Sequence, residues 1–502
     1  MTAALTSMPD WLRQRAQSTP SRFALRCGAD RLTFAELDAL VDVAVAHLQD
    51  EGVRPGHVVG VLARNSTGFV VAVHAIARLG AVLLPLNLRL IPSELAWQLR
   101  DAGAHRLLHD ESQREIGRAV RDEIAPLQLL PLEAISKQQA IAEARHASPL
   151  HDAQRPFDLG ATHSLVYTSG TTGTPKAAML TYGNHLWSAI GSALNLGLRE
   201  DDRWLACLPL FHVGGLAILL RGAIYGTTAI VHESFDAARV NASIDDDGVT
   251  IISVVANMLQ RMLDQRGERP YPKSLRCVLL GGGPAPEPLL QRCAALGVPV
   301  VQTYGLTEAA SQVSTLAPED ALRKLGSAGK PLFGTQLRIE NSEGEVLAPG
   351  VEGEIVVHGP TVTPGYLNRP DATSRAIRDG WLHTGDIGYV DSEGYLYVLD
   401  RRDDLIVSGG ENVYPAEIEA VLQSHPDVIE AGVYGAPDER WGQRPVATVV
   451  LRPGATVTPD ALVAHCRERL AAYKTPSRIE VRDELPRNAA GKLVRSRLRD
   501  EG

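Results

Sequence analysis

The chain has 502 residues, which corresponds to roughly three domain-sized units of ~150 residues each. Hydrophobic residues make up 44% of it and charged residues 22%, the proportions of a folded protein, so an extensively disordered chain is excluded. The 50 basic and 59 acidic residues give a net charge of −9. This balance argues against general binding to nucleic acid or to an anionic membrane, but it allows a local basic pocket for a phosphate.

The five cysteines are spaced far apart, and no Cys-x-x-Cys pair occurs. This pattern argues against a disulfide scaffold or a cysteine-based zinc site and favours a reducing compartment. The first residues, MTAALTSMPDWLRQRA, lack the basic and apolar regions of a signal peptide. The longest apolar stretches, 69–86 and 216–230, are broken by Arg, Pro or Gly. We therefore expect a cytoplasmic protein without a membrane span.

Strand-like and helix-like patterns alternate over the first 330 residues. Thr33 and Glu36 have the spacing of a capping box, which predicts a helix that continues to Leu48. Residues 111–160 are more polar and predict a helix plus a connecting loop. Strand–helix–strand order at this spacing predicts parallel sheets with covering helices. The clearest further elements are a strand at 58–63, a helix at 68–79, and strands at 81–84, 251–255 and 277–281.

The pattern changes after Gly329. Short strands with turn signals follow over residues 330–400 and predict a small antiparallel barrel or sheet. From residue 404 onward a compact α+β pattern begins, with a helix near Pro415 and another over 459–471. We predict a multidomain α/β protein. Its large N-terminal domain, residues 1–402, has mixed and parallel sheets and ends in the barrel-like part, and its smaller α+β C-terminal domain spans residues 403–502.

A segment rich in glycine and hydroxyl groups follows the predicted strand at 165–167. Its glycines free backbone N–H groups to turn toward an anion, its hydroxyls add donors, and its lysine adds charge. This composition predicts a loop that binds the phosphates of a nucleotide, and a merely flexible loop is the alternative. The segment is not a Walker A motif. Its binding residues would be Thr168, Ser169, Gly170, Thr171, Thr172, Gly173 and Lys176.

This segment resembles the phosphate loop of the acyl-adenylate-forming superfamily, which includes acyl- and aryl-CoA synthetases, peptide-synthetase adenylation domains and firefly luciferase. Other segments resemble further motifs of that superfamily in the same order. The resemblance covers the chain from 165 to 495 and implies ATP, Mg²⁺ and coenzyme A as cofactors or co-substrates. The segments are 302–308 (adenine and magnesium), 381–386 (ribose), 400–404 and 408–415 (hinge and following loop) and 486–492 (C-terminal lysine).

Several side chains in these segments have chemistry that suits ATP. Thr307 and Glu308 follow a predicted strand, where α/β sheets place ligands, and a carboxylate such as that of Glu308 can hold Mg²⁺. Asp386, in a Gly-Asp turn, can accept hydrogen bonds from both ribose hydroxyls. Arg401 can bridge the ribose and the α-phosphate. The alternatives for single residues are that Glu308 is a surface acid, that Asp386 only forms a turn, and that Arg401 forms a surface ion pair.

Three more positions concern the base and the transferred group. Gly281 and Gly283 let the chain pass close to a flat base, and Tyr304 offers a face for stacking. Lys492 lies among arginines, which by itself indicates a solvated basic tail. The resemblance implies instead that Lys492 is catalytic, because a cation beside the α-phosphate and the attacking carboxylate offsets their repulsion.

The resemblance also implies a mobile C-terminal domain that rotates about Asp403 between two half-reactions. Gly409 and Gly410 would then replace Lys492 near the site and help to form a channel for the thiol of coenzyme A. Two features depart from the superfamily. Ala177 stands where a glycine is common, and the hinge has acidic residues where it commonly reads Gly-Arg-x-Lys.

Longer runs resemble the o-succinylbenzoate–CoA ligases of menaquinone biosynthesis, notably 181–185, 188–197, 211–216, 280–286, 315–320 and 325–331. This implies an acid with two carboxylates, of which the ring carboxylate needs a partner. Arg221 interrupts the apolar run 216–230 and is our candidate, although it could instead reach solvent or cap a helix end. His212, in a Phe-His-x-Gly-Gly loop, is expected to line the acyl pocket beside the reacting carboxylate, with a purely structural histidine as the alternative.

We therefore expect an enzyme, an AMP-forming acid–thiol ligase, that binds a small carboxylic acid, ATP and coenzyme A and no nucleic acid. Self-association into a homo-oligomer is left open. Three alternatives remain: the same chemistry on another aryl or medium-chain acid, a luciferase-like oxygenase, and a silent adenylate-binding homologue. Intact Glu308, Asp386, Arg401 and Lys492 argue against the last.

Overall fold

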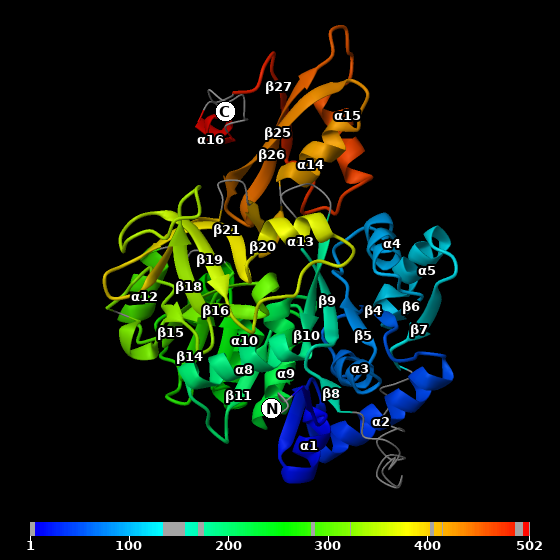
Figure 1. Ribbon diagram of the computed structural model, residues 1–502, viewed down its shortest axis with the longest axis vertical. Helices are drawn as coiled ribbons and strands as arrows, with labels where there is room; N and C mark the ends of the chain where they lie inside the picture. Colours follow the sequence, from blue (N-terminus) through cyan, green and yellow to red (C-terminus); the bar gives the residue numbers. More distant parts are fainter. Residues whose placement is uncertain are drawn as a thin grey trace.

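The structure is a computed structural model and describes residues 6–133, 156–168, 175–282, 287–321, 323–401, 406–413, 415–486 and 495–500. In Figure 1 the N-terminal part, residues 6–401, forms the larger body, and the C-terminal part, residues 406–500, lies above it. No helix in these ranges is long and apolar enough to cross a membrane.

A six-stranded sheet forms one side of the N-terminal part, in the order β10-β9-β5-β4-β6-β7. Every pairing in it is parallel except that of β10 with β9, so the predicted parallel arrangement is confirmed. Its strands are β4 (Val58–Leu62), β5 (Val82–Pro85), β6 (Arg106–His109), β7 (Gln128–Pro131), β9 (Thr162–Thr168) and β10 (Lys176–Thr181).

Strand β7 is a difference from the prediction for residues 111–160. The expected helix is present as α5 (Arg114–Glu123), but the chain then returns to the sheet as an edge strand rather than as a loop. The four residues of β7 end in Pro131, which an edge position tolerates. A segment this short contains too few residues for an alternating pattern to be visible in the sequence.

A nine-stranded sheet has the order β17-β16-β15-β14-β13-β11-β12-β2-β3. Its centre is parallel and its two ends are antiparallel. Beyond the two large sheets, β1 (Ser7–Met8) pairs with β8 (Phe157–Asp158). The strands are β2 (Phe23–Cys27), β3 (Asp30–Thr33), β11 (Arg203–Ala206), β12 (Thr228–Val231), β13 (Ile251–Val254), β14 (Cys277–Leu280), β15 (Val300–Leu306), β16 (Ser311–Thr315) and β17 (Lys330–Pro331).

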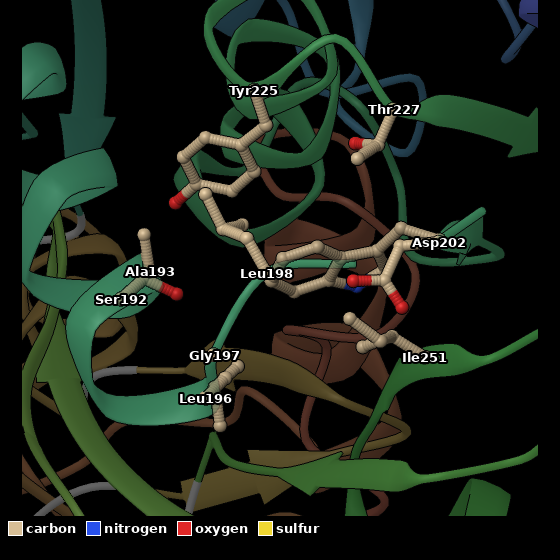
Figure 2. Close-up of a pocket in the computed structure, with 10 residues that line it drawn as sticks. Ser192, Ala193, Leu196, Gly197, Leu198, Asp202, Tyr225, Thr227 and Ile251 are labelled. Carbon is tan, nitrogen blue, oxygen red and sulfur yellow. The ribbon is translucent and has the colours of Figure 1, made fainter. Parts of the chain in front are cut away.

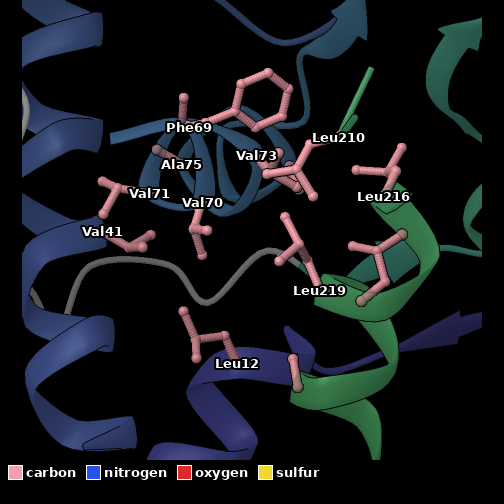
Figure 3. Packing of buried hydrophobic residues seen from close by; sticks show 14 of the residues in the cluster. Leu12, Val41, Phe69, Val70, Val71, Val73, Ala75, Leu210, Leu216 and Leu219 are labelled. Carbon is pink, nitrogen blue, oxygen red and sulfur yellow. The ribbon is translucent and has the colours of Figure 1, made fainter. Parts of the chain in front are cut away.

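Helix α3 (Thr67–Arg78) lies in the middle of the largest hydrophobic cluster. Figure 3 shows Val70 and Val73 of this helix facing Leu216 and Leu219 of α9 (Val213–Tyr225), with Leu12 below them. All five side chains are buried. The remaining helices of this part are α1 (Trp11–Ser18), α2 (Phe34–Asp50), α4 (Pro92–Asp101), α8 (Tyr182–Leu196), α10 (Ala237–Asp246), α11 (Ala256–Arg266), α12 (Glu287–Ala295) and α13 (Pro370–Ala376).

Helix α2 begins as the sequence predicted. The Thr33 hydroxyl accepts a hydrogen bond from the backbone N–H of Glu36, and the Glu36 carboxylate accepts one from the N–H of Thr33. These reciprocal bonds satisfy two backbone donors that the first turn of a helix leaves unpaired. The capping box is therefore confirmed.

Five antiparallel strands follow the nine-stranded sheet and confirm the predicted small antiparallel sheet. This sheet begins at Gln336 rather than at residue 330, because β17 still pairs with β16. The strands are β18 (Gln336–Glu340), β19 (Gly353–His358), β20 (Ile377–Arg378), β21 (Trp381–Val390) and β22 (Leu396–Arg401).

The C-terminal part contains a second five-stranded sheet, with its own hydrophobic cluster. Its second helix ends at Arg467, four residues before the predicted end at 471. The predicted boundary at residue 402 falls outside the described residues and stays a prediction. The elements are β23 (Ile406–Ser408), β24 (Glu411–Val413), α14 (Pro415–Gln423), β25 (Val428–Asp438), β26 (Gly442–Leu451), α15 (Pro459–Arg467), β27 (Arg478–Val481) and α16 (Arg495–Asp500).

Two buried histidines make stability depend on pH. Burial lowers the pKa of His74 to about 4, and burial together with the Arg221 charge lowers the pKa of His185 to about 3. Well above pH 6.5, the ordinary pKa of histidine, both are neutral in either state. Below that pH the unfolded chain binds a proton at each histidine and the folded protein does not, so acid favours unfolding.

We predict that lowering the pH from 7 to 5 removes about 2 kcal/mol of stability per histidine. The measurement is the free energy of unfolding in urea at both pH values, for the wild type and for His74→Asn and His185→Asn. Each variant should lose less stability over this range than the wild type does. An identical loss in all three proteins would contradict the assignment.

Candidate active site

The ends of the predicted phosphate loop lie beside the predicted magnesium residue. Thr168 ends β9 and Lys176 begins β10, and the two backbones pair directly. The Thr168 hydroxyl donates to Glu308 Oε1 over 3.3 Å, although the two residues are 140 positions apart. The structure therefore brings together two segments that the sequence assigned to one nucleotide. The predicted loop residues between Thr168 and Lys176 lie outside the described residues: Ser169, Gly170, Thr171, Thr172 and Gly173.

Glu308 lies in a short 3₁₀ turn, Thr307–Ala309, that follows β15 and precedes β16. The turn is possible because Gly305 lies against the returning strand: a Cβ atom there would be 1.6 Å from the carbonyl oxygen of Ser311. Any other residue would push β15 and β16 apart. This close approach explains the glycine of the Tyr-Gly-Leu-Thr-Glu segment and fixes Thr307 and Glu308 at the strand end.

Tyr366 is a member of this site that the sequence did not identify. Its hydroxyl donates to Glu308 Oε1 over 2.9 Å, and the Lys176 ammonium lies 5.6 Å from the centre of its ring. Burial and the nearby charge of Arg375 lower the pKa of Lys176, while Glu308 acts to raise it. A partly desolvated cation is thus held beside a carboxylate, an arrangement that suits a phosphate and its metal ion.

The donor set fits Mg²⁺ carried by a nucleotide. Glu308 supplies a half-buried carboxylate, the hard oxygen ligand that Mg²⁺ prefers. Within the described ranges, no cluster of three or more His, Cys, Asp or Glu side chains could hold a metal. One carboxylate with substrate phosphates and water is a common way in which proteins bind Mg²⁺.

The predicted ribose residue lies next to the predicted adenine segment. The Tyr304 hydroxyl donates to Asp386 Oδ2 over 2.6 Å, and both residues are buried. The Tyr304 ring packs in the hydrophobic cluster of the antiparallel sheet, so stacking on a base stays a prediction. The backbone of Arg401 pairs with that of Asp386 across β21 and β22. The side chain of Arg401 and residue Gly283 lie outside the described residues.

Gly281 marks where the chain passes the carboxyl ends of the parallel strands. A Cβ atom at this position would be 3.0 Å from Thr303 Cγ2, so the two strand ends are in close contact.

Ala177, which stands where the superfamily commonly has glycine, fits its position in the fold. It is fully buried in β10, and it is not among the residues with a positive φ. The methyl group therefore causes no backbone strain there.

Glu411 reaches from the C-terminal part into the N-terminal part. Its Oε2 lies 3.2 Å from His212 Nε2 and accepts a hydrogen bond from Asn87, and its Oε1 lies 3.3 Å from Arg89 Nη1. Burial acts to raise the pKa of Glu411, but His212, Arg89 and Asn87 hold it below its usual value. The buried carboxylate is thus ionised and ties the loop that contains Gly409 and Gly410 to His212.

His212 lies immediately before α9 and contacts Glu411, and its side chain is 44% exposed. It can therefore face a substrate while its Nε2 contacts Glu411. The exposed Gly410 lies in the turn immediately before Glu411, which begins β24. A Cβ atom on Gly410 would be 3.9 Å from Val255 Cγ2 across the interface. Lys492 lies outside the described residues.

Arg221 is buried in the middle of α9, with 3% of its surface exposed. It therefore neither reaches solvent nor caps a helix end, the two alternatives that the sequence left open. Its Nη2 donates to the Ser188 hydroxyl over 3.1 Å, and its guanidinium lies 5.4 Å from the Trp204 ring. In the described part of the chain Arg221 forms no ion pair, and its Nε has no hydrogen-bond partner. Burial accordingly lowers its pKa.

Ser188 connects this cation to the nucleotide side of the site. Its hydroxyl donates to the carbonyl oxygen of Ala310 over 2.6 Å, two residues beyond Glu308. Ala310 has a positive φ of 50° and Ser311 one of 102°, conformations that are costly for residues with a side chain. Arg221, Ser188 and Ala310 thus form a chain of contacts from α9 to the turn that holds Glu308.

A small cavity lies beside Trp204 and Tyr225, on the side of α8 that carries Ser192. Figure 2 shows this cavity, with Ser192 on one side and Thr227 and Ile251 on the other. Its volume is about 10 Å³, the space of a single water molecule. It is far too small for an aromatic acid, and Arg221 is not among the residues that line it.

The sequence matches two family models. Residues 12–367 match the model of the AMP-binding enzymes, and residues 417–492 match that of the AMP-binding enzyme C-terminal domain. The chain belongs to the AMP-binding enzyme family. The expected membership of the acyl-adenylate-forming superfamily is therefore confirmed.

Two named relatives are similar to this chain over nearly its whole length. The 2-succinylbenzoate–CoA ligase of Geobacillus sp. (strain WCH70) is 51% identical over 98% of this chain and 97% of its own length. The 2-succinylbenzoate–CoA ligase of Bacillus mycoides is 50% identical over 99% of both.

A solved structure of a double mutant of o-succinylbenzoate CoA synthetase from Bacillus subtilis, bound with the product analogue OSB-NCoA, is 46% identical. It covers 99% of both chains with a TM-score of 0.91. The complex of the Bacillus subtilis synthetase with the acyl-adenylate OSB-AMP, also 46% identical and covering 98% of both chains, has a TM-score of 0.75. The overall arrangement of this chain is thus more similar to the product-analogue complex than to the adenylate complex.

We predict that Glu308→Gln raises the Mg²⁺ concentration needed for adenylation and weakens transition-state stabilisation by ~2–4 kcal/mol, the scale of one preorganised charged group. The measurement is acid-dependent pyrophosphate release during an Mg²⁺ titration. Tyr366→Phe is the matched control, because it removes a hydrogen bond to Glu308 but keeps the carboxylate. Full activity of Glu308→Gln with an unchanged titration would refute the assignment.

Proposed function

We propose that this chain is a 2-succinylbenzoate–CoA ligase that converts o-succinylbenzoate, ATP and coenzyme A to o-succinylbenzoyl-CoA, AMP and pyrophosphate. Relatives of that name support this reaction, because they are 50–51% identical to this chain over nearly its full length. The observation that carries the choice of acid is Arg221, a fully buried cation with no ion pair in the described residues. This reaction belongs to the biosynthesis of menaquinone, as the sequence resemblance implies.

In the first half-reaction the acid carboxylate attacks the α-phosphate of ATP, giving acyl-adenylate and pyrophosphate. Thr168 at the end of β9 and Lys176 at the start of β10 bind the phosphates. Asp386 accepts hydrogen bonds from the ribose hydroxyls. Glu308 holds Mg²⁺, which neutralises phosphate charge when bound. Lys492 stabilises the charge that develops between the attacking carboxylate and the α-phosphate.

In the second half-reaction the thiol of coenzyme A attacks the acyl carbonyl, and AMP leaves. The C-terminal part rotates about Asp403, so that the loop with Gly409 and Gly410 takes the place of Lys492. The contact of Glu411 with His212 supports this assignment, because it holds that loop over the acyl side of the site. The two half-reactions therefore use different groups at one centre.

The ring carboxylate of o-succinylbenzoate pairs with Arg221. A buried guanidinium without a counter-charge is costly, and an entering carboxylate removes that cost. Ser188 already orients the guanidinium, and it also contacts Ala310 near Glu308. A benzoate without a second carboxylate would leave the cation unpaired, so the pocket discriminates against it.

The direct test of this function is a panel of acids in a pyrophosphate-release assay, followed by detection of the CoA thioester by mass spectrometry. We expect o-succinylbenzoate to give the highest kcat/KM, above benzoates, coumarates and medium-chain acids. Preference for one of those acids would support the alternative of the same chemistry on another substrate. Oxygen uptake with a luciferin would support the luciferase-like alternative. The cytoplasmic location and any self-association stay predictions of the sequence.

We predict that Arg221→Ala lowers kcat/KM for o-succinylbenzoate by about 10- to 150-fold, the equivalent of losing one charge-assisted hydrogen bond. A related acid without the ring carboxylate should be used about as well as by the wild type, because it never made the contact. The comparison of the two acids separates recognition from a folding defect, which would lower both. Equal losses for both acids would make Arg221 structural.

We also predict a division of labour between Lys492 and Gly410. Lys492→Ala should abolish adenylation but leave thioester formation from supplied acyl-adenylate nearly intact. Gly410→Leu should do the reverse, because Gly410 has a positive φ of 85° and a leucine there would obstruct the thiol channel. The two half-reactions are measured separately. Similar losses of both half-reactions in each variant would contradict the two-state scheme.

A further inference from the structure

A second contact joins the two parts of the chain, away from the nucleotide residues. Lys474 of the C-terminal part donates to Glu417 Oε1 over 2.8 Å and to Glu94 Oε1 over 3.0 Å. Glu417 lies in the first turn of α14, in the same part as Lys474, whereas Glu94 lies in the first turn of α4, in the N-terminal part. One ammonium group therefore bridges two carboxylates, one from each part.

This bridge is buried. Lys474 is 4% exposed and Glu417 6% exposed, and the Glu94 side chain is 14% exposed. Figure 1 shows α4 at the upper right of the N-terminal part, below α14. Charge-assisted hydrogen bonds in a site of low dielectric are stronger than those on the surface. The bridge is thus stronger than an ordinary surface ion pair.

The arrangement of charges separates folding from docking. The pair Lys474–Glu417 lies wholly within the C-terminal part, so it persists when that part moves. The bond to Glu94 exists only while the two parts are docked as they are here. Burial opposes the charge on Lys474, but Glu417, Tyr473 and Glu94 raise its pKa, so it stays protonated at neutral pH. Glu417 contributes more than Glu94 and stays with Lys474 when the C-terminal part moves, so Lys474 keeps a counter-charge if the contact with Glu94 is lost.

We propose that Glu94 is a positioning residue: it binds Lys474 as a latch that holds the C-terminal part in the orientation for thioester formation. The inference rests on the proposed two-step ligase reaction. In the described part of the chain, neither side chain forms a hydrogen bond or ion pair with a residue assigned to ATP or the acid. The latch therefore changes how often Glu411 and the glycines before it lie over the site. It should favour the second half-reaction and leave the chemistry of the first unchanged.

The variant that tests the latch is Glu94→Gln. A glutamine can still accept the hydrogen bond from the backbone N–H of Ile91 that begins α4, so the helix is preserved while the charge is removed. Glu36→Gln is the matched control. Glu36 has the same capping role in α2, which lies at the lower end of the N-terminal part in Figure 1.

We expect Glu94→Gln to slow thioester formation from supplied acyl-adenylate by about five- to tenfold, as expected when a charge-assisted hydrogen bond becomes a neutral one. Adenylation, measured as pyrophosphate exchange, should change less than about twofold, because the latch does not act on it. Glu36→Gln should leave both rates unchanged. Equal losses of both half-reactions, or no loss of thioester formation, would overturn the latch.

A second readout does not depend on the substrate. Spin labels on cysteines introduced at Arg118 and Glu468, both with exposed side chains, report the distance between the two parts once the half-buried Cys27 is changed to serine. Glu94→Gln should broaden or shift the distance distribution, and Glu36→Gln should not. Identical distributions would overturn the latch. Absence of pyrophosphate release with o-succinylbenzoate in the wild type would instead overturn the proposed function and leave this readout valid.

Discussion

The ionised carboxylate of Glu411 is the contact on which the arrangement of this site depends. A buried charge must be matched by partners, and every partner of Glu411 identified here belongs to the other part of the chain: His212, Arg89 and Asn87. The loop of the C-terminal part is therefore held directly over the acyl side of the N-terminal part. The geometry of the site therefore changes whenever the orientation of the two parts changes.

The opposite case is Arg221, a buried cation whose charge the described protein does not match. Glu411 is matched when the two parts dock, whereas Arg221 has no counter-charge in the described residues, and we propose that the substrate supplies it. These two unequal situations account for the proposed order of events. The acid is recognised inside the N-terminal part, and docking of the C-terminal part then completes a separate set of charges for the thiol.

Local sequence signals predicted much of the fold. The capping box of Thr33 and Glu36 and the parallel strands of the first 330 residues follow from short-range patterns, and the structure has them. Strand β7 was missed, because its four residues carry no periodic signal. Motif resemblance identified Thr168 and Glu308 separately, and the structure shows them 3.3 Å apart between Oγ1 and Oε1.

The contacts between distant segments could not be predicted. Glu411 and His212 are 199 positions apart, and their contact depends on how two separately folded sheets are placed. Tyr366 lies outside the motifs, so nothing in its neighbours indicated its bond to Glu308. The sequence revealed a charge at Arg221 within an apolar run, but the direction of a side chain on a helix follows from packing on α8 and β11.

The most direct test of the central claim is a crystal structure of this protein with the acyl-adenylate of o-succinylbenzoate. The account predicts the ring carboxylate within about 2.7–3.2 Å of the Arg221 guanidinium, the range of a hydrogen bond, with the adenylate ribose on Asp386. A ring carboxylate that lies in solvent or on other donors, with Arg221 still unpaired, would contradict it.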